Sequence, residues 1–590
     1  MGTGHTIDSP IRVAHLGITS VISIVDDHLT ERIRAWYAKE FEMPFTSISR
    51  SATDSRARRI TAYLDLVQDI VEQKFEAMKQ MPFAVGNDKF RYFEMLPDAS
   101  ELKQLWNRIK VDGLGLISPE LEHQLTSLMK AGSIDVNIMS KVDRITYDKE
   151  GNPLPAMYSD ASSALRGYAN SKLQSALVLS AGFNPRLYGY LSEFRDFYRD
   201  ATGTLRKKII LKVSDFRSAL VQGKFLAKKG LEVAEFRIES GLNCGGHAFP
   251  SDGQLMPTIL REFREKRDQL MDEFRPLIRS WYDKMGWDWH AAIDEHQPLL
   301  TVQGGVGTHG EMQRLMDVYG ADLVGWGSPF LLVPEATSVD DPTLQQLVNA
   351  KEEDLYLSNV SPLGVPFNNI RGSGSEVWTT DRIKKGKPGS SCPKGFLETN
   401  TEFTDKPICT ASSEYQDKKL EQIASLDVDD AIRAAMVQDV YDKTCLCDHL
   451  GNGSLITLGI VKESHGKQAI CPGPNIAWFS GPYTLQEMVD HIYGRTQITP
   501  VERPHMFAKE LEMYVDYLSV NLSKTDPNDA KAMSKLTTIH SNLMSGIEEL
   551  RAIAHSDGYA QENLPSLSAT IDRQEARLLS MDELQPLVHA

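Results

Sequence analysis

The stretch Glu239-Ser-Gly-Leu-Asn-Cys-Gly-Gly-His247 decides the expected fold. It follows an aliphatic run, Val233–Ile238. Two more aliphatic runs that end in glycine turns come later, Leu299-Leu-Thr-Val-Gln-Gly-Gly-Val-Gly307 and Leu323-Val-Gly-Trp-Gly-Ser-Pro-Phe-Leu-Leu332. Short aliphatic runs that alternate with helical patterns are typical of parallel α/β proteins. Glycine turns after consecutive strands bring backbone N–H groups close to a phosphate. The three units predict a β/α barrel that binds a phosphate-bearing cofactor at the carboxyl ends of its strands.

The predicted fold is an α/β (β/α)8 TIM barrel over residues 1–340, with helical insertions at 27–130 and 248–298. Residues 341–500 form a cysteine-rich irregular region, and residues 501–590 a helical C-terminal part. Two ranges are candidates for the eighth strand, Phe83–Val85 and Gly115–Ile117, and the sequence does not decide between them. The other strands are expected at Ile11–Leu16, Ile134–Met139, Ala176–Ser180, Lys208–Val213, Val233–Glu239, Leu299–Gln303 and Asp322–Trp326.

The order and wording of these motifs resemble the FMN-binding barrels of the nitronate monooxygenases and the flavin-dependent enoyl-ACP reductases, over about residues 207–335. The glutamate synthase flavin domain is a looser likeness. In the first two families a Gly-Gly-His follows the sixth strand, and two glycine turns after strands seven and eight hold the FMN phosphate. The resemblance implies an FMN-dependent oxidoreductase whose phosphate site is Gly304, Gly305, Gly307, Gly325, Gly327 and Ser328.

Three residues are the candidates for catalysis. Lys212 ends a buried-type strand, where related flavin barrels place a lysine against the reduced flavin ring; pairing with Asp215 or Glu239 is the alternative. His247 is the candidate proton-transfer group, since imidazole titrates near neutral pH. Cys244 is either a redox or nucleophilic thiol or a small buried residue. The families show Glu-Ala where this chain has Asn243-Cys244, which leaves the substrate open.

Several polar residues near strand ends are weaker candidates for the mouth of the barrel. Asn137 and Ser180 are expected to contact the flavin, with Lys141 and Asn184 as further candidates and Arg166 as a candidate anion contact. Strand order alone supports these assignments.

Five of the six cysteines fall within one short region and are the candidate metal ligands: Cys392, Cys409, Cys445, Cys447 and Cys471. Four thiolates hold an iron–sulfur cluster or tetrahedral zinc. Their spacing matches neither ferredoxin runs nor zinc knuckles, so the density of thiols and the neighbouring flavin favour a [4Fe–4S] cluster. Zinc or no metal are the alternatives, and His449 or His465 could replace one ligand.

The net charge of −16 over 590 residues disfavours binding to nucleic acid or to anionic membranes. The absence of a long apolar run and of a leader pattern predicts a cytoplasmic protein. A homodimer is expected only because two-fold symmetric dimers are the commonest oligomers of soluble proteins. No Gly-x-Gly-x-x-Gly unit is present, so NAD(P)H or a protein donor would reach the flavin directly. Two rival interpretations stay open: a nitronate monooxygenase-like or enoyl reductase-like flavoenzyme without a cluster, and a non-catalytic barrel scaffold.

Overall fold

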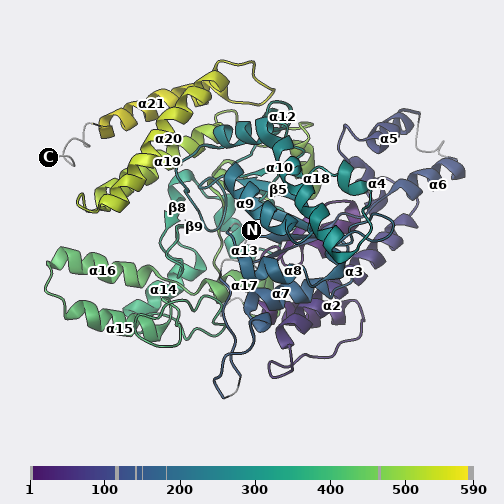
Figure 1. The fold of residues 1–590 in the computed structure, drawn as a ribbon. Coiled ribbons are helices and arrows are strands. Elements are labelled where there is room, and N and C mark those ends of the chain that lie inside the picture. The colour runs from purple at the N-terminus through teal and green to yellow at the C-terminus, as the bar shows by residue number, and fades with distance from the viewer. Residues whose placement is uncertain are drawn as a thin grey trace.

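The fold is that of a computed structural model, which describes residues 4–112, 118–139, 142–148, 150–180, 182–462 and 467–582. Its centre is a seven-stranded parallel sheet in which each strand pairs with the next one along the chain (Figure 1). This order is the one that successive β/α units produce. The strands are β1 (Ser20–Ile24), β2 (Ile134–Ile138), β3 (Ala176–Leu179), β4 (Lys208–Val213), β5 (Val233–Glu239), β6 (Leu299–Gln303) and β7 (Leu323–Gly325).

The expected first strand was wrong. Residues Ile11–Leu16 belong to α1 (Ser9–Val13) and the 3-10 helix η1 (Ala14–Leu16), and the true first strand is β1. Pro10 explains the difference, because proline fits the first turn of a helix. Of the two candidates for an eighth strand, Phe83–Val85 is not a strand and Gly115–Ile117 lies outside the described residues. The other six expected strands are confirmed.

No described ladder joins β7 to β1, and helical segments lie at this edge instead. The Ser338 N–H donates to the His5 carbonyl at 2.8 Å, and Ser9 Oγ donates to the Ala336 carbonyl at 2.6 Å. Val13 and Leu16 share one apolar cluster with Leu331, Leu332 and Val333. The chain that follows β7 therefore packs on the N-terminal helix across the open edge, so that the structure is a seven-stranded, barrel-like sheet.

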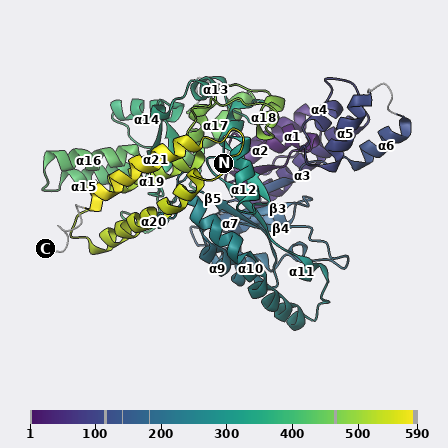
Figure 2. The ribbon, with the colours of Figure 1, turned by 90° about the horizontal axis from the view of Figure 1, so that it is seen from above.

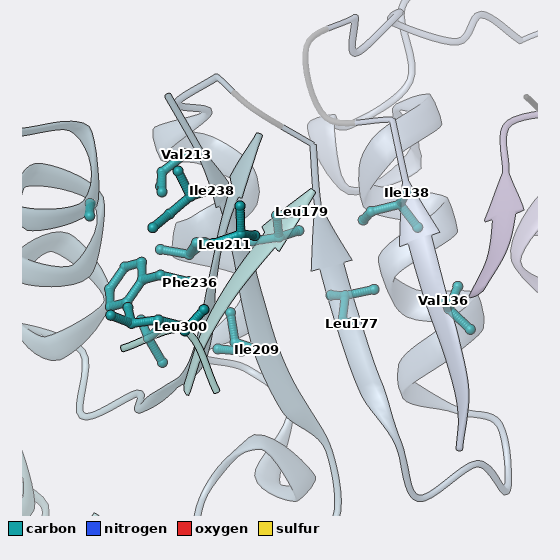
Figure 3. Close-up of a cluster of buried hydrophobic side chains, with 14 of the residues drawn as sticks. Val136, Ile138, Leu177, Leu179, Ile209, Leu211, Val213, Phe236, Ile238 and Leu300 are labelled. Carbon is teal, nitrogen blue, oxygen red and sulfur yellow. The ribbon is translucent and has the colours of Figure 1, made fainter. Parts of the chain in front are cut away.

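The two faces of the sheet have different partners. Figure 3 shows the outward side chains of β2 to β6, such as Leu211 and Phe236, which belong to the main core with the surrounding helices. Ala176, Val178 and Ile210 form a separate small cluster with Val21 on the other face. Side chains alternate between the faces of a strand. Lys212 follows Ile210 by two residues in β4, so its side chain lies on the same face of the sheet as Ile210, the concave face.

Helices connect the strands as expected for β/α units (Figures 1 and 2). The chain between β1 and β2 is mostly helical, and the chain between β5 and β6 contains the 30-residue helix α10 and the short helix α11. The connecting helices are α2 (Asp27–Glu40), α3 (Ser55–Lys79), α4 (Asp88–Glu94), α5 (Glu101–Asp112), α6 (Pro119–Leu128), α7 (Asp160–Ala169), α8 (Pro185–Leu191), α9 (Phe216–Ala227), α10 (Met256–Met285), α11 (Ala292–Glu295) and α12 (His309–Asp317).

After β7 the chain builds an antiparallel hairpin, β8 (Leu355–Ser358) with β9 (Phe367–Ile370), and a set of helices. These helices are α13 (Asp341–Val348), α14 (Gly374–Lys384), α15 (Ser413–Ala424), α16 (Asp430–Asp442), α17 (Leu446–Thr457), α18 (Leu485–Ile492), α19 (Met506–Lys524), α20 (Ala530–Ala554) and α21 (Leu564–Asp582). The C-terminal part of the described chain thus contains the three helices α19, α20 and α21.

The last three helices are not separate from the sheet. Leu511 and Tyr514 of α19 and Ile547 of α20 belong to the same buried cluster as the outward residues of the strands. Figure 1 shows α19, α20 and α21 side by side. Because these helices pack on the sheet, the boundaries expected between regions of the chain at residues 340 and 500 stay predictions. No helix among the described residues is long and apolar enough to cross a bilayer.

Candidate active site

Three polar side chains form a connected row across the carboxyl ends of β4, β5 and β6. Lys212 Nζ lies 2.7 Å from Glu239 Oε2, and Gln303 Nε2 donates to Glu239 Oε1 at 2.7 Å. Each residue is the last or next-to-last of its strand. Of the two sequence-based interpretations of Lys212, the structure shows the pairing with Glu239 that was the alternative. Its role toward a flavin stays a prediction.

Glu239 keeps its negative charge in this row. Burial raises its pKa, but attraction and a hydrogen bond from Lys212, together with the Gln303 amide, lower it by more. The net pKa of Glu239 is below its ordinary value. The row therefore presents a fixed ion pair, with the lysine cation facing the same end of the sheet as the glycine turns.

The half-buried Cys244 thiol lies beside this ion pair. Its Sγ contacts the Ser240 carbonyl oxygen at 3.3 Å. Burial, followed by the charge of Glu239, raises the pKa of Cys244 far above that of a free thiol. At neutral pH the thiol is protonated, so it is a poor nucleophile. This favours the small buried residue over the redox or nucleophilic group among the two interpretations of Cys244.

His247 lies on a loop that the β8–β9 hairpin holds in place. The Asn368 N–H donates to the Gly246 carbonyl, and the Ala248 N–H donates to the Pro366 carbonyl. The His247 ring packs edge-on against Phe367, with 4.9 Å between ring centres, and its Nε2 is 2.7 Å from Ser361 Oγ. The histidine is therefore positioned by residues more than a hundred positions later in the chain.

The glycines of the turn after β6 are required by close packing. A Cβ on Gly305 would lie 2.1 Å from Asn243 Nδ2, and one on Gly307 would lie 2.3 Å from Arg503 Nε. Gly304 and Gly305 also have φ values of 114° and 81°, which favour glycine. These requirements come from protein neighbours, so the glycines alone do not establish a phosphate site.

A buried ionic network supports this turn from outside. Arg503 donates to Glu311 Oε1 at 2.7 Å, to Asn475 Oδ1 at 2.8 Å and to the Gly305 carbonyl at 2.6 Å. Glu311 Oε2 in turn accepts the Gly307 N–H at 2.8 Å. A cavity of about 10 Å³, room for roughly one water, adjoins Gly305, Asn243, Arg503 and Lys509.

The turn after β7 lies beside the turn after β6, because their strands are neighbours. One downstream segment touches both: the Gly473 N–H donates to Ser328 Oγ at 2.7 Å, and Asn475 Nδ2 donates to the Val306 carbonyl at 2.7 Å. In the described chain, no hydrogen bond uses the N–H of Gly305 or Gly327. The two turns are thus at one end of the sheet and close together, with the segment 473–475 packed against both.

Buried polar atoms without a described partner occur in several parts of the chain, and three of them follow or end strands of the sheet. Asn137 Oδ1, Asn243 Oδ1 and Trp326 Nε1 are of this kind. Asn137 Nδ2 donates to Ser23 Oγ of the neighbouring strand at 3.3 Å, and Ser180 directly follows β3. Buried polar atoms usually have partners. The Asn137 and Asn243 side-chain oxygens can therefore accept hydrogen bonds from a bound group.

Two weaker candidates have structural partners instead. Arg166 is bonded to the Asp54 carboxylate on the helical side of the sheet, so its guanidinium is already paired with an anion. Asn184 caps α8 by accepting the Leu187 N–H at 3.1 Å. Lys141 lies outside the described residues.

The five C-terminal cysteines meet in one place. Cys409 and Cys471 belong to a small apolar cluster that also contains Phe367, and Cys392 and Cys447 pack against it. Cys445 lies outside this cluster but interacts electrostatically with Cys392 and Cys447. No disulfide joins any of the six cysteines. However, the described residues include no group of three or more His, Cys, Asp or Glu side chains arranged to hold a metal ion. His449 is bonded to Ser375 Oγ at 2.7 Å, and His465 lies outside the described residues. The expected metal centre is thus unsupported.

Comparisons with known proteins add little. No family model matches the chain, and no curated protein matches it. Among solved structures, FabK from Thermotoga maritima aligns at 13% identity with a TM-score of 0.31, covering 69% of this chain and 86% of its own. The enoyl reductase domain of MlnA, from the macrolactin biosynthesis cluster of Bacillus amyloliquefaciens, aligns at 12% identity with a TM-score of 0.33, covering 77% and 89%.

Sequence reasoning missed the residues that later parts of the chain bring to the site. Arg503, Asn475, Ser361 and Phe367 lie far from the strand ends in sequence, and no motif marks them. Gln303 could have been found, because it is a polar residue that ends an otherwise aliphatic strand before Gly304.

Proposed function

We propose that the protein is an FMN-dependent oxidoreductase whose active site lies at the carboxyl ends of β4 to β7. The observation that carries the proposal is the meeting, at one end of the sheet, of the Lys212–Glu239 ion pair and the two glycine turns after β6 and β7. The resemblance of residues 207–335 to flavin barrels supports the same conclusion.

The residues present fit an FMN group. The N–H groups of Gly305 and Gly327, which have no described acceptor, are donors suited to a phosphate. The unpaired buried oxygen of Asn137 is suited to the polar edge of a flavin ring. Space is the remaining requirement: the segment 473–475 contacts both turns, so it has to shift when the phosphate binds.

Bound FMN would supply hydride and electron transfer, while the protein orients the substrate and sets the local charge. Lys212 would hold a positive charge beside the ring and favour its anionic reduced form. Glu239 fixes the lysine in place. His247, aligned by Ser361 and Phe367, would donate or accept a proton at the substrate.

An iron–sulfur cluster forms no part of this proposal. Residues arranged to hold a metal ion are not found among those described, so neither cluster nor zinc chemistry is assigned to the cysteines. The small-molecule substrate remains to be identified, and two chemistries are the candidates: reduction of an enoyl thioester and oxidation of a nitronate.

Turnover by FMN-loaded protein tests the proposal with two probes. One assay follows NADPH oxidation with a crotonyl thioester, and the other follows oxygen uptake with an alkyl nitronate. His247→Gln should lose at least about 100-fold in activity on the accepted probe while retaining FMN. His296→Gln is the matched control, because His296 donates to the Val233 carbonyl at the opposite end of β5. FMN-loaded protein that is inactive on both probes would favour a scaffold.

A further inference from the structure

The C-terminal helix α19 holds the loop that follows β5. Three residues of the helix, spaced four residues apart on one face, contact this loop. The contacts are those of the Met506 carbonyl with Asn243 Nδ2 at 3.0 Å, of Glu510 Oε1 with Ser240 Oγ at 2.5 Å, and of the Tyr514 hydroxyl with Gly241, where a Cβ would lie 2.4 Å away. The loop that carries Cys244 and His247 is therefore packed on a helix near the other end of the chain.

Glu510 fastens both ends of this loop. Its Oε1 accepts from the hydroxyl of Ser240, which directly follows β5. Its Oε2 accepts the N–H of Met256, the first residue of α10, at 2.9 Å. The connection from β5 to α10, residues 240–256, thus begins and ends at one carboxyl group, and His247 lies between the two ends.

Glu510 is buried without a positively charged partner. The residue is 2% exposed. In the described part of the chain its two oxygens contact the Ser240 hydroxyl and the Met256 N–H, and no cation is among the influences on its pKa. A carboxylate in such surroundings is costly, whereas the protonated acid is not. Burial accordingly raises the pKa of Glu510 to about 7.

The titratable groups of the elements around Glu510 are neutral or already paired. Burial raises the pKa of Tyr514 and of Cys244, so both are neutral between pH 5 and pH 8. Charged groups of the same elements form pairs: Lys212 with Glu239 at the strand ends, Arg503 with Glu311, His505 with Glu562 and Lys509 with Glu352 in the first part of α19, and Arg261 with Glu549 between α10 and α20. The Glu510 carboxyl is thus the group whose charge changes beside the loop.

We propose that Glu510 makes the loop 240–256 a pH-dependent element: the protonated carboxyl keeps both ends of the loop closed on α19, and loss of the proton favours an open loop. In the open loop the carboxylate reaches water, and its proton passes to the solvent. The closed loop therefore binds this proton more tightly than the open loop does, so the equilibrium between the two depends on pH.

The size of the effect follows from the two proton affinities. The pKa of Glu510 is about 7 in the closed loop, and its ordinary value of 4.5 applies once the loop is open. The proton stabilises the closed loop fully below about pH 4.5, and this stabilisation is lost as the pH rises to about 7. The equilibrium constant for opening should therefore increase about tenfold between pH 6 and pH 8. Any effect on proton transfer by His247 rests on the proposed function, whereas the pH-dependent opening does not.

Amide hydrogen exchange of the full-length chain without FMN, measured by mass spectrometry of its peptides, tests the loop directly. The N–H groups of Asn243 and Phe249 report its opening, because they donate to the Ser240 hydroxyl and the Gly241 carbonyl. Glu510→Gln has the shape of the protonated acid and cannot ionise. The wild-type exchange rate divided by the Glu510→Gln rate at the same pH cancels the intrinsic pH dependence of exchange. This ratio should rise about tenfold from pH 6 to pH 8.

Glu549→Gln is the matched control for the removal of a carboxylate that contacts α10. Glu549 Oε2 accepts from Thr258 Oγ1 at 3.1 Å, and Arg261 lies beside it at 3.6 Å. A ratio that changes as much with this variant as with Glu510→Gln would show that the effect does not come from Glu510.

Two further results would overturn the proposal. One is a ratio for Glu510→Gln that is the same at pH 6 and pH 8. The other is exchange of the loop at the rate of β4 at both pH values, because only unfolding of the whole chain would then expose the carboxyl. If Glu510→Gln fails to fold, the wild-type rates corrected for the intrinsic exchange of an unfolded chain carry the same tenfold expectation. A chain that does not bind FMN would refute the proposed function and leave this measurement unaffected.

Discussion

Lys212 and Glu239 form an ion pair with a 2.7 Å separation across the carboxyl ends of two neighbouring strands. Each side chain is about one-fifth exposed, so the pair is partly screened by solvent. Gln303 on the next strand completes the contacts of the carboxylate. This row supplies the cation that a reduced flavin would need.

Lys212→Met should leave the Glu239 carboxylate without its positively charged partner. Breaking one partner of a buried pair costs about 3–5 kcal/mol, and partial exposure reduces the expected loss to about 1–3 kcal/mol. Urea unfolding measures it. The double variant Lys212→Met/Glu239→Gln should recover part of this stability without recovering activity. Equal stability of the single variant and the wild type would mean that the pair contributes nothing.

Gly305→Ala should damage both stability and FMN binding. The new Cβ would meet Asn243 at 2.1 Å, and φ at this position is 81°. Gly320→Ala is the matched control, because its φ is 69° and nothing lies within 4 Å of a Cβ there. The control should lose about 1–2 kcal/mol from backbone strain alone and keep FMN, while Gly305→Ala should lose about 1–3 kcal/mol more. Equal losses in thermal unfolding would refute the packing argument.

Arg503→Met should leave the Glu311 carboxylate buried without its cation. The two side chains are 5% and 1% exposed, so the full penalty of about 3–5 kcal/mol is expected. Glu311 also accepts the Gly307 N–H, so the turn after β6 should loosen. Amide exchange at residues 305–307 reports that loosening. Adding Glu311→Gln should restore stability, and a double variant as unstable as Arg503→Met would contradict the assignment.

Glu510 gives a pH-dependent prediction. Burial raises its pKa to about 7, although Ser240 Oγ and the Met256 N–H donate to it at 2.5 and 2.9 Å. The ordinary value is 4.5, so the folded chain holds this proton over a pH range in which the unfolded chain has lost it. The stability that the proton contributes is full below about pH 4.5 and is lost as the pH rises to about 7.

Glu510→Gln removes this dependence. Relative to wild type, the variant should gain about 2–3 kcal/mol of unfolding free energy between pH 5 and pH 8. Glu548→Gln on the exposed face of α20 is the control for the removal of a carboxylate by itself. Urea unfolding at several pH values measures both. A pH-independent difference for Glu510→Gln would show that the carboxyl group titrates normally.

The sequence predicted those strands whose ends are marked by the local sequence. The aliphatic runs before His247, Gly304 and Gly325 locate β5, β6 and β7, because local alternation and glycine turns do not depend on distant contacts. The first strand was missed because Ile11–Leu16 is as apolar as a strand, and only Pro10 marks it as helical. The partners of the turns, such as Arg503 and Gly473, come from tertiary packing that no local pattern encodes.

The amount of FMN bound by the full-length chain tests the central claim most directly. Protein purified without added cofactor, then titrated with FMN and desalted, should show the two-band absorption of a flavin at one FMN per chain. Gly305→Ala should retain less than a tenth of that amount, while Gly320→Ala should retain all of it. A wild-type chain that stays colourless after titration would contradict the account.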